Sequence, residues 1–292
     1  MSDVSHRRTW AGLALAILAV SWSAILVRWA EAAPALVIAF YRMFWSSLLF
    51  AGTGLLKGGG LRLRSPLTTR QKWIVAGAGI LLALHFATWI GSLKFTTVAH
   101  SLTLYATQPI FALLFGPFLL DERGDLRAML AAGMAMVGVA VIAGLDVDVA
   151  SPDQLFGDLL ALSSAVFMTL YLFAARAMRA AIDLHRYLVR VYGGAAALLL
   201  LMVLLAGEPL VDYPPDTHLM MLLLALVPTG IGHSLLNWAA RRLEAYKVNM
   251  TNLGEPVVAS ALAALFFAEF PGVWFYPGAA LILAGIAITL RR

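Results

Sequence analysis

The chain has 292 residues, of which 61% are hydrophobic and only 13% are charged. A soluble domain carries about 25% charged residues, so 21 basic and 16 acidic side chains cannot solvate this much apolar chain. Disorder is excluded because disordered chains are poor in apolar residues. The absence of cysteine excludes a disulfide scaffold, thiolate metal sites and cysteine nucleophiles. These features predict a polytopic helical membrane protein.

Ten segments are apolar enough to cross the bilayer as helices, each needing about 20 residues to span roughly 30 Å of hydrocarbon. The first is too long for the apolar core of a cleaved signal peptide. We therefore expect an all-α fold with ten transmembrane helices at Trp10–Trp29, Pro34–Leu56, Trp73–Leu93, Thr97–Leu120, Leu126–Gly144, Gln154–Ala175, Tyr187–Ala206, Thr217–Ala240, Tyr246–Ala268 and Val273–Leu290.

The basic residues predict the orientation of these spans, because cytoplasmic loops are rich in Lys and Arg. With both termini cytoplasmic, Arg28 and Lys94 fall outside and Arg42 falls within a span, whereas acidic residues fill the outer loops at Asp146, Asp148, Asp153, Glu208, Asp212 and Asp216. The other 18 basic residues fall inside, at Arg7, Arg8, Lys57, Arg62, Arg64, Arg70, Lys72, Arg123, Arg127, Arg176, Arg179, Arg186, Arg190, Arg241, Arg242, Lys247, Arg291 and Arg292. We expect a multi-pass protein of a bacterial-type inner (plasma) membrane. The net charge of +5 then reflects topology and does not indicate a nucleic acid partner.

The chain also repeats itself. Leu104–Gly116 reads LYATQPIFALLFG and Thr251–Ala263 reads TNLGEPVVASALA, which places Pro109 opposite Pro256 at a separation of 147 residues. Similar separations pair Glu122 with Glu269, Gly138 with Gly285, Gly12 with Gly157, Trp22 with Phe167, His85 with His233 and Trp89 with Asn237.

We therefore predict two five-helix halves, residues 1–147 and 148–292. Because five is odd, the second half enters the membrane inverted. Inverted repeats are typical of secondary transporters, which bind substrate near the midplane where the repeats meet. A duplication without a transport role, as in some scaffolds and membrane enzymes, is the alternative.

Several motifs resemble the drug/metabolite transporter superfamily, EamA type. They are Leu18-Ala19-Val20-Ser21-Trp22, Phe40-Tyr41-Arg42, Pro109 with Glu122, Pro256 with Glu269, and the small residues of the fifth and tenth spans. Within the superfamily the chain is most similar to the YddG-like aromatic amino acid exporters. The resemblance implies a central cavity lined by spans 1–4 and 6–9, with spans 5 and 10 at the periphery.

Glu255 is the most informative polar residue at membrane depth, where an acid is costly and needs a reason. It precedes Pro256, whose missing N–H frees the carbonyl of Asn252. Asn252, Glu255 and that carbonyl could form one polar patch that receives a substrate ammonium or relays protons. The structural alternative is a neutral Glu255 bonded to a neighbouring helix. The exporters that the chain resembles need not have an acid here.

The equivalent position in the fourth span is Gln108, which shares a helix face with Tyr105 and precedes Pro109. This face could stack against and hydrogen-bond an amphipathic substrate. Interhelical hydrogen bonding, worth about 1 kcal/mol, is the alternative.

Two histidines each have a polar or aromatic partner four residues later on the same helix face: His85 with Trp89, and His233 with Asn237, which Trp238 follows. We expect these residues to line the cavity, and packing histidines are the alternative. A metal site is disfavoured, because no HExxH spacing or nearby acid is present in either span. No cofactor is expected.

Aromatic rings form a further group of candidates for substrate binding. Trp22 and Phe167 lie in the middle of their spans rather than at an interface, and Tyr171 follows Phe167 by four residues. Such rings could stack on an aromatic substrate, although ordinary core or lipid-facing packing is as good an explanation. Tyr41 completes the group expected to contact substrate.

Arg42 lies about 12 Å deep in the second span. It could snorkel, pair with Glu31, or bind a substrate carboxylate. Because the family pattern has an arginine here generally, we favour a structural role.

The remaining candidates concern gating and helix packing. Pro228, Gly230 and Gly232 form a breaker cluster in the eighth span, which we interpret as a hinge. Glu122, near Arg123 and Arg127, is expected to anchor a charged lip, with Glu269 at the opposite face. Small residues at Gly133, Gly138, Gly278 and Gly285 allow close helix packing and leave a homodimer possible.

The leading hypothesis is a secondary transporter that exports amino acids, large apolar or aromatic ones, by alternating access, with the bilayer and a small-molecule substrate as partners. Export of drugs, lipophilic cations or other small metabolites is the alternative. An integral-membrane enzyme would have to use the loop acids Asp146, Asp148 and Asp153, and we expect none. No Walker loop is present, so this chain does not hydrolyse ATP.

Overall fold

The computed structural model describes residues 3–56, 66–96, 98–143, 151–268, 270 and 272–290. In this part of the chain every regular element is a helix, which confirms the all-α prediction. The helices are α1 (Asp3–Val20), α2 (Trp22–Trp29), α3 (Ala35–Leu56), α4 (Thr69–Ser92), α5 (Val98–Tyr105), α6 (Gln108–Leu119), α7 (Leu126–Ala143), α8 (Pro152–Ala177), α9 (Leu184–Ala206), α10 (Pro215–Leu224), the π-helix η1 (Ala225–His233), α11 (Ser234–Ala240), α12 (Ala245–Asn252), α13 (Gly254–Phe267) and α14 (Phe275–Leu290).

Eight segments of the described chain are long and apolar enough to cross a membrane. They correspond to eight of the predicted spans, and the fifth and tenth predicted spans correspond to two shorter apolar helices, Leu126–Ile142 and Phe275–Thr289. Several predicted residues lie outside the described part of the chain, namely Lys57, Arg62, Arg64, Thr97, Gly144, Asp146, Asp148, Glu269, Arg291 and Arg292.

Local sequence signals begin and end several helices. The Thr68 side chain accepts a hydrogen bond from the N–H of Gln71, whose side chain accepts one from the N–H of Thr68, so a capping box starts α4. Ser151 caps α8 and Asp183 caps α9 in the same way, each through the N–H three residues on. Gly207, with φ of 66°, ends α9 in the left-handed conformation that glycine adopts without strain.

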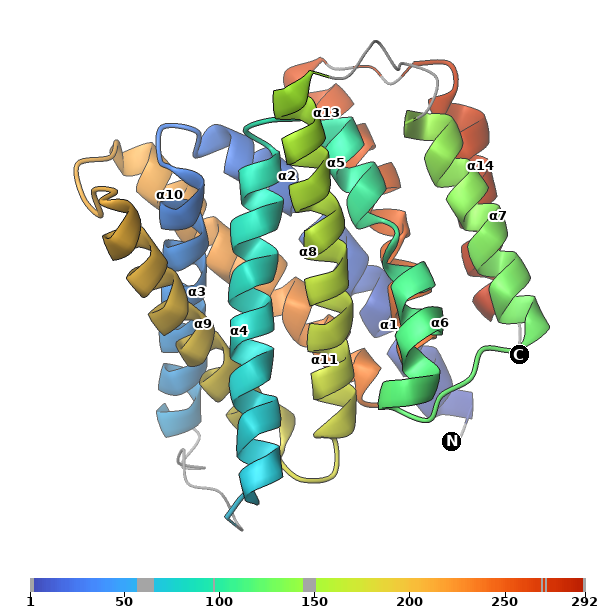
Figure 1. Ribbon diagram of the computed structural model, residues 1–292, viewed down its shortest axis with the longest axis horizontal. Coiled ribbons are helices and arrows are strands. Elements are labelled where there is room, and N and C mark those ends of the chain that lie inside the picture. The colour runs from blue at the N-terminus through green and yellow to red at the C-terminus, as the bar shows by residue number, and fades with distance from the viewer. Residues whose placement is uncertain are drawn as a thin grey trace.

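The helices form one bundle with a flanking pair (Figure 1). Within the bundle α4 packs against both α8 and α9, and α3 packs against α9. The flanking pair is α7 and α14, which pack chiefly on each other. The start of α1 and the end of α14 lie at the same end of the molecule.

Glycines bring α7 and α14 into contact. A Cβ added at Gly138 would lie 2.5 Å from the carbonyl oxygen of Gly278, and one at Gly285 would lie 2.7 Å from that of Ala131. Three of the four predicted packing glycines therefore serve this contact. Gly133 does not, because a Cβ there would meet nothing within 4 Å.

Two predicted spans are interrupted next to proline. The fourth breaks between Tyr105 and Gln108, and the ninth breaks at Leu253. Pro109 and Pro256 each lack an N–H and clash with the carbonyl four residues earlier, which bends the helix at that place. The two breaks occupy equivalent positions of the repeated sequence.

The eighth predicted span contains a π-helix around Pro228. Its Gly232 is the point of closest approach to α1, where an added Cβ would lie 2.6 Å from Cγ1 of Val20 and 3.1 Å from its backbone nitrogen. The irregular backbone that the breaker cluster predicts is thus present, and its role as a hinge stays a prediction.

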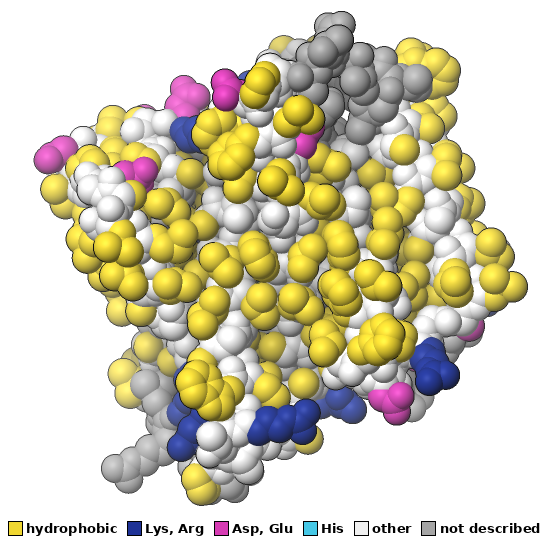
Figure 2. Space-filling model, viewed as in Figure 1, with side chains coloured by type: hydrophobic (Ala, Val, Ile, Leu, Met, Phe, Trp, Pro, Cys, Tyr) yellow, Lys and Arg dark blue, Asp and Glu magenta, His cyan; other side chains and the backbone are white. Residues whose placement is uncertain are grey.

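The surface has the charge pattern of a membrane protein. In Figure 2 hydrophobic side chains cover the middle of the molecule, whereas Lys and Arg side chains gather along its lower edge. The broad apolar surface lies between the two polar ends.

Candidate functional site

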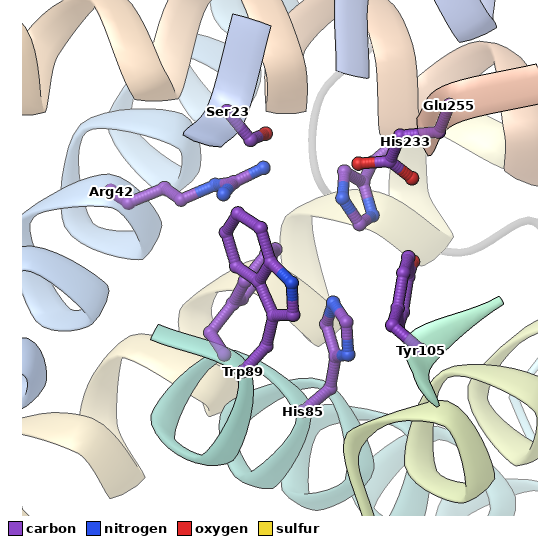
Figure 3. Close-up of a pocket in the computed structure, with 8 residues that line it drawn as sticks. Ser23, Arg42, His85, Trp89, Tyr105, His233 and Glu255 are labelled. Atoms are coloured by element: carbon purple, nitrogen blue, oxygen red, sulfur yellow. The ribbon is translucent and has the colours of Figure 1, made fainter. Parts of the chain in front are cut away.

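A small pocket lined by buried residues collects polar and aromatic side chains from six helical elements (Figure 3). The space among them holds about one water molecule. The residues that line this central pocket are Ser23 of α2, Arg42 of α3, His85, Phe86 and Trp89 of α4, Tyr105 of α5, His233 of η1 and Glu255 of α13.

Arg42 is fully buried in this pocket. Its Nε donates to Thr229 Oγ1 at 2.7 Å, and its Cζ lies 4.0 Å from the centroid of the Phe86 ring. The two terminal nitrogens have no hydrogen-bond partner within the protein. Arg42 therefore does not snorkel to the surface, and its hydrogen-bonding partner is Thr229 rather than Glu31. Two buried donors remain available to a ligand.

Glu255 lines the same pocket and is 4% exposed. Among the described residues no ion pair within 4.0 Å joins it to Arg42. In Figure 3 its carboxyl group lies near the rings of His233 and Tyr105, on the side of the pocket away from Arg42. The backbone carbonyl of Glu255 accepts a hydrogen bond from Ser21 Oγ at 3.4 Å, which holds α13 against the bend between α1 and α2.

The two histidines predicted to line the cavity meet at its centre. Their ring centroids are 6.0 Å apart, and the His85 ring lies 5.5 Å from that of Tyr105. Nδ1 of His85 lies 3.2 Å from the carbonyl oxygen of Ser164. Because a carbonyl only accepts, Nδ1 carries the hydrogen, and Nε2 of the neutral ring is an acceptor. Among the residues that the structure describes, no group of three or more His, Asp or Glu side chains is suited to hold a metal ion.

The candidates in the fourth and ninth predicted spans also come together. Nδ2 of Asn252 lies 3.3 Å from the Tyr105 hydroxyl and 3.5 Å from Gln108 Oε1. Nε2 of Gln108 donates at 3.1 Å to the carbonyl of Tyr105, the group that Pro109 leaves without an N–H. Gln108 therefore makes the interhelical contact named above as the alternative to substrate binding, and it does not line the central pocket.

A second buried pair lies beside the pocket. Nδ2 of Asn237 donates to the Tyr171 hydroxyl at 2.5 Å and to the carbonyl of His233 at 2.6 Å. Both side chains are fully buried. They connect α11 to α8 and position the end of η1, which carries His233.

Four candidate aromatic residues lie away from the pocket. Trp22 packs against Phe266 of α13 with ring centroids 5.3 Å apart, and Phe167 is half-buried on α8. Tyr41 donates to the carbonyl of Leu210 at 2.8 Å. Trp238 stacks against the Arg242 guanidinium, with Cζ 4.2 Å from the ring centroid.

Sequence reasoning missed Ser23, Phe86 and Thr229. Phe86 could have been found, because it lies three residues before Trp89 and so shares a helix face with it. The hydroxyls of Ser23 and Thr229 carry no comparable signal, since serine and threonine in membrane helices usually bond to their own backbone.

Glu122, which follows α6, connects the segment after that helix to α8 and α12. Its Oε1 lies 2.6 Å from Arg176 Nε on α8, and its Oε2 accepts from the N–H of Ala245 at 2.8 Å, the first residue of α12. Both of these partners come from the other half of the chain, whereas Arg123 and Arg127 were the neighbours expected from sequence.

Comparison with known proteins identifies the family. The model of the EamA-like transporter family matches this chain twice, over residues 9–144 and 155–291. A curated relative, the uncharacterized transporter YxxF of Bacillus subtilis (strain 168), is 23% identical over 216 residues, which cover 73% of this chain and 68% of that protein.

A solved structure, described only as the crystal structure of a protein, superposes with a TM-score of 0.80 at 22% identity, covering 97% of this chain and 96% of that one. This likeness concerns the fold. The two family matches span most of the sequence, and the long apolar helices agree with a multi-pass membrane protein. The chain therefore belongs to the EamA-like transporter family and is a membrane transporter of small substrates rather than an enzyme.

Proposed function

We propose that the protein is a secondary transporter that exports amino acids, large apolar or aromatic ones, across a bacterial-type inner membrane. The observation that carries the proposal is the composition of the central pocket, in which a buried cation and a buried acid share one space with the rings of Trp89 and Tyr105. A free amino acid presents an ammonium, a carboxylate and a side chain, and each finds a matching group there.

We also propose that the ten predicted spans form two inverted halves with both termini cytoplasmic. Contacts between equivalent residues support this. His85 and His233 pack together, and Asn252 bonds to Tyr105, 147 positions earlier. Equivalent residues touch only near the axis that relates two repeats, and in inverted-repeat transporters that axis lies in the membrane plane beside the substrate. The double match of the family model agrees with it.

Alternating access explains why the pocket is so small. A space for about one water molecule cannot hold an amino acid, so the surrounding helices must move to admit one. The bends next to Pro109 and Pro256 and the π-helix at Pro228 are places where the backbone is already irregular. Movement at these places would open the pocket toward one side of the membrane at a time.

Export of lipophilic cations is the second candidate. It is favoured by Glu255 lying close to aromatic rings, since both attract cations. It is disfavoured by the Arg42 guanidinium in the same pocket, which repels a cation in a medium of low dielectric constant.

Flux into proteoliposomes distinguishes the two candidates. We expect uptake of radiolabelled tryptophan and none of tetraphenylphosphonium, and the reverse result would favour the cation exporter. Measuring Glu255→Gln across several pH values tests the site, with Glu31→Gln at the exposed turn between α2 and α3 as control. If flux and its pH profile stay unchanged in Glu255→Gln, Glu255 is structural. A loss of pH dependence in that variant alone would indicate proton coupling.

A further inference from the structure

We infer that the central pocket recognises both charged ends of a zwitterion, with Arg42 receiving the substrate carboxylate and Glu255 receiving the ammonium. This inference rests on the proposed function and gives Arg42 a role in recognition. The role goes beyond the structural one that the family pattern favours.

The first observation is the set of unused donors on Arg42. Its Nε is held by Thr229 at 2.7 Å and one face of the guanidinium is held by the Phe86 ring, so the group has a fixed orientation. Its two terminal nitrogens are buried and have no partner within the protein. A pair of parallel N–H donors fits a carboxylate in bidentate fashion. A buried charge left unpaired is costly, so the geometry points to an anion that arrives with the substrate.

The second observation is the separation of the two charges. Arg42 and Glu255 line one pocket without an ion pair between them, and in Figure 3 the guanidinium and the carboxyl group lie on opposite sides of it, with the His233 ring beside the carboxyl group. A salt bridge would satisfy both side chains without any substrate. Held apart, each charged group stays available to a molecule that carries both charges and enters when the surrounding helices move.

Charge balance selects the ligand class. Apart from the rings of His85, His233 and Tyr105, the titratable side chains that line the pocket are Arg42 and Glu255, so a zwitterion adds no net charge inside the membrane and pairs both. A cation alone would leave Arg42 unpaired and would be repelled by it, and an anion alone would do the same at Glu255. Since unpaired charge at membrane depth is expensive, a zwitterionic α-amino acid is the favoured ligand.

Other buried polar atoms without a partner could add donors for the carboxylate or acceptors for the ammonium. The indole N–H of Trp89 is a buried donor without a partner and lines the pocket, where it can add to the carboxylate site. Oδ1 of Asn252 is also a buried acceptor without a partner, but Asn252 does not line the pocket. Nε2 of His85 is a further acceptor.

The test compares tryptophan with two analogues in proteoliposomes. Tryptamine lacks the carboxylate and indole-3-propionate lacks the ammonium. We expect the wild-type protein to transport tryptophan at least about tenfold better than either, because a site built for a polar group rejects analogues that lack it. Equal transport of tryptophan and tryptamine would overturn the inference and leave the proposed function standing. Transport of none of the three would contradict the proposed function itself.

A variant of Arg42 tests whether this residue receives the substrate carboxylate. In Arg42→Gln we expect tryptophan flux to fall at least about tenfold and the preference for tryptophan over tryptamine to disappear. Arg28→Gln is the matched control, because Arg28 is exposed and stacks on Phe267 outside the pocket. Its preference should stay at the wild-type value. An unchanged preference in Arg42→Gln would overturn the role of Arg42.

A milder variant covers the case in which Arg42→Gln does not fold. Thr229→Val removes the hydroxyl that orients the guanidinium and keeps the charge. We expect a higher KM for tryptophan with an unchanged KM for tryptamine in this variant. Equal changes for both compounds would mean that Thr229 and Arg42 act only on the fold.

Discussion

Arg176 and Glu122 form a largely enclosed ion pair, with Nε and Oε1 2.6 Å apart and side chains only 13% and 15% exposed. The other carboxylate oxygen of Glu122 accepts the N–H of Ala245 at 2.8 Å. One carboxylate thus connects the ends of α6 and α8 to the start of α12. We call this set the Glu122 clamp, and it closes this end of the bundle.

The Glu122 clamp predicts a change in accessibility when it is broken. The chain contains no cysteine, so one introduced at the fully buried Val248 on α12 is a unique reporter. With Glu122→Gln we expect this cysteine to react with a water-soluble maleimide several-fold faster, because losing a partly buried pair costs about 1 kcal/mol or more. The control is Asp183→Asn, which breaks the more exposed pair with Arg186. Equal labelling rates in both backgrounds would mean that the clamp does not hold this end closed.

A coupling between Gln108 and Pro109 is the second prediction. Gln108→Leu leaves the buried carbonyl of Tyr105 without a donor, which costs about 1–3 kcal/mol of unfolding free energy. In a Pro109→Ala background the backbone N–H of residue 109 can donate to that carbonyl. Gln108→Leu should then lower the free energy of unfolding by at least about 0.5 kcal/mol less than it does in the wild-type background. Thermal unfolding of the four proteins measures the difference. Pro117→Ala, farther along α6, is the control background and should show simple additivity.

The contact between α7 and α14 gives a third prediction. Gly138→Ala forces the two helices apart, because its Cβ would lie 2.5 Å from the carbonyl oxygen of Gly278. We expect a loss of about 1–3 kcal/mol, seen as a lower melting temperature in detergent. Gly133→Ala on the same helix is the control, and it should not destabilise, because its Cβ meets nothing within 4 Å. Similar melting temperatures for both variants would show that α7 and α14 do not pack as described.

Asp183 predicts a pH dependence at the start of α9. Partial burial would raise the pKa of its carboxyl, but hydrogen bonds from the backbone N–H and guanidinium of Arg186 outweigh burial and lower it below the ordinary value. A lowered folded-state pKa contributes stability above the unfolded pKa of about 4, and this is lost as pH falls through the folded value.

Asp183→Asn keeps the helix cap and removes the charge. We expect the variant to have a lower free energy of unfolding than wild type at pH 7. The loss should be no more than about 1 kcal/mol, because the Asp183 side chain is half exposed. The difference between the two proteins should shrink as pH falls below the ordinary carboxyl pKa and vanish once Asp183 is protonated in the folded state. A difference that grows toward low pH would have the wrong sign for this mechanism.

Much of the local structure follows from short stretches of sequence. The breaks near Pro109 and Pro256 and the irregular turn at Pro228 were predictable, because proline removes an N–H wherever it stands in a helix. The contact between His85 and His233 was harder to predict, because the prediction depended on recognising the internal repeat.

The partners of individual side chains were not predictable in the same way. Trp22 and Trp89 are both predicted to contact substrate, but only Trp89 lines the central pocket. Arg42 bonds to Thr229, a residue 187 positions away. The partner of a side chain depends on how its helix is rotated about its axis and on which helix packs against it. The sequence of a single segment does not specify either of these.

The sequence by itself determined that this protein belongs in a membrane and where its apolar segments lie, because the burial of apolar chain is a local property. Only the tertiary structure decided that Arg42 and Glu255 share one pocket without pairing and that Glu122 joins the other half of the chain at Arg176. Those relations arise when distant helices pack, and packing depends on the shape of all of them at once.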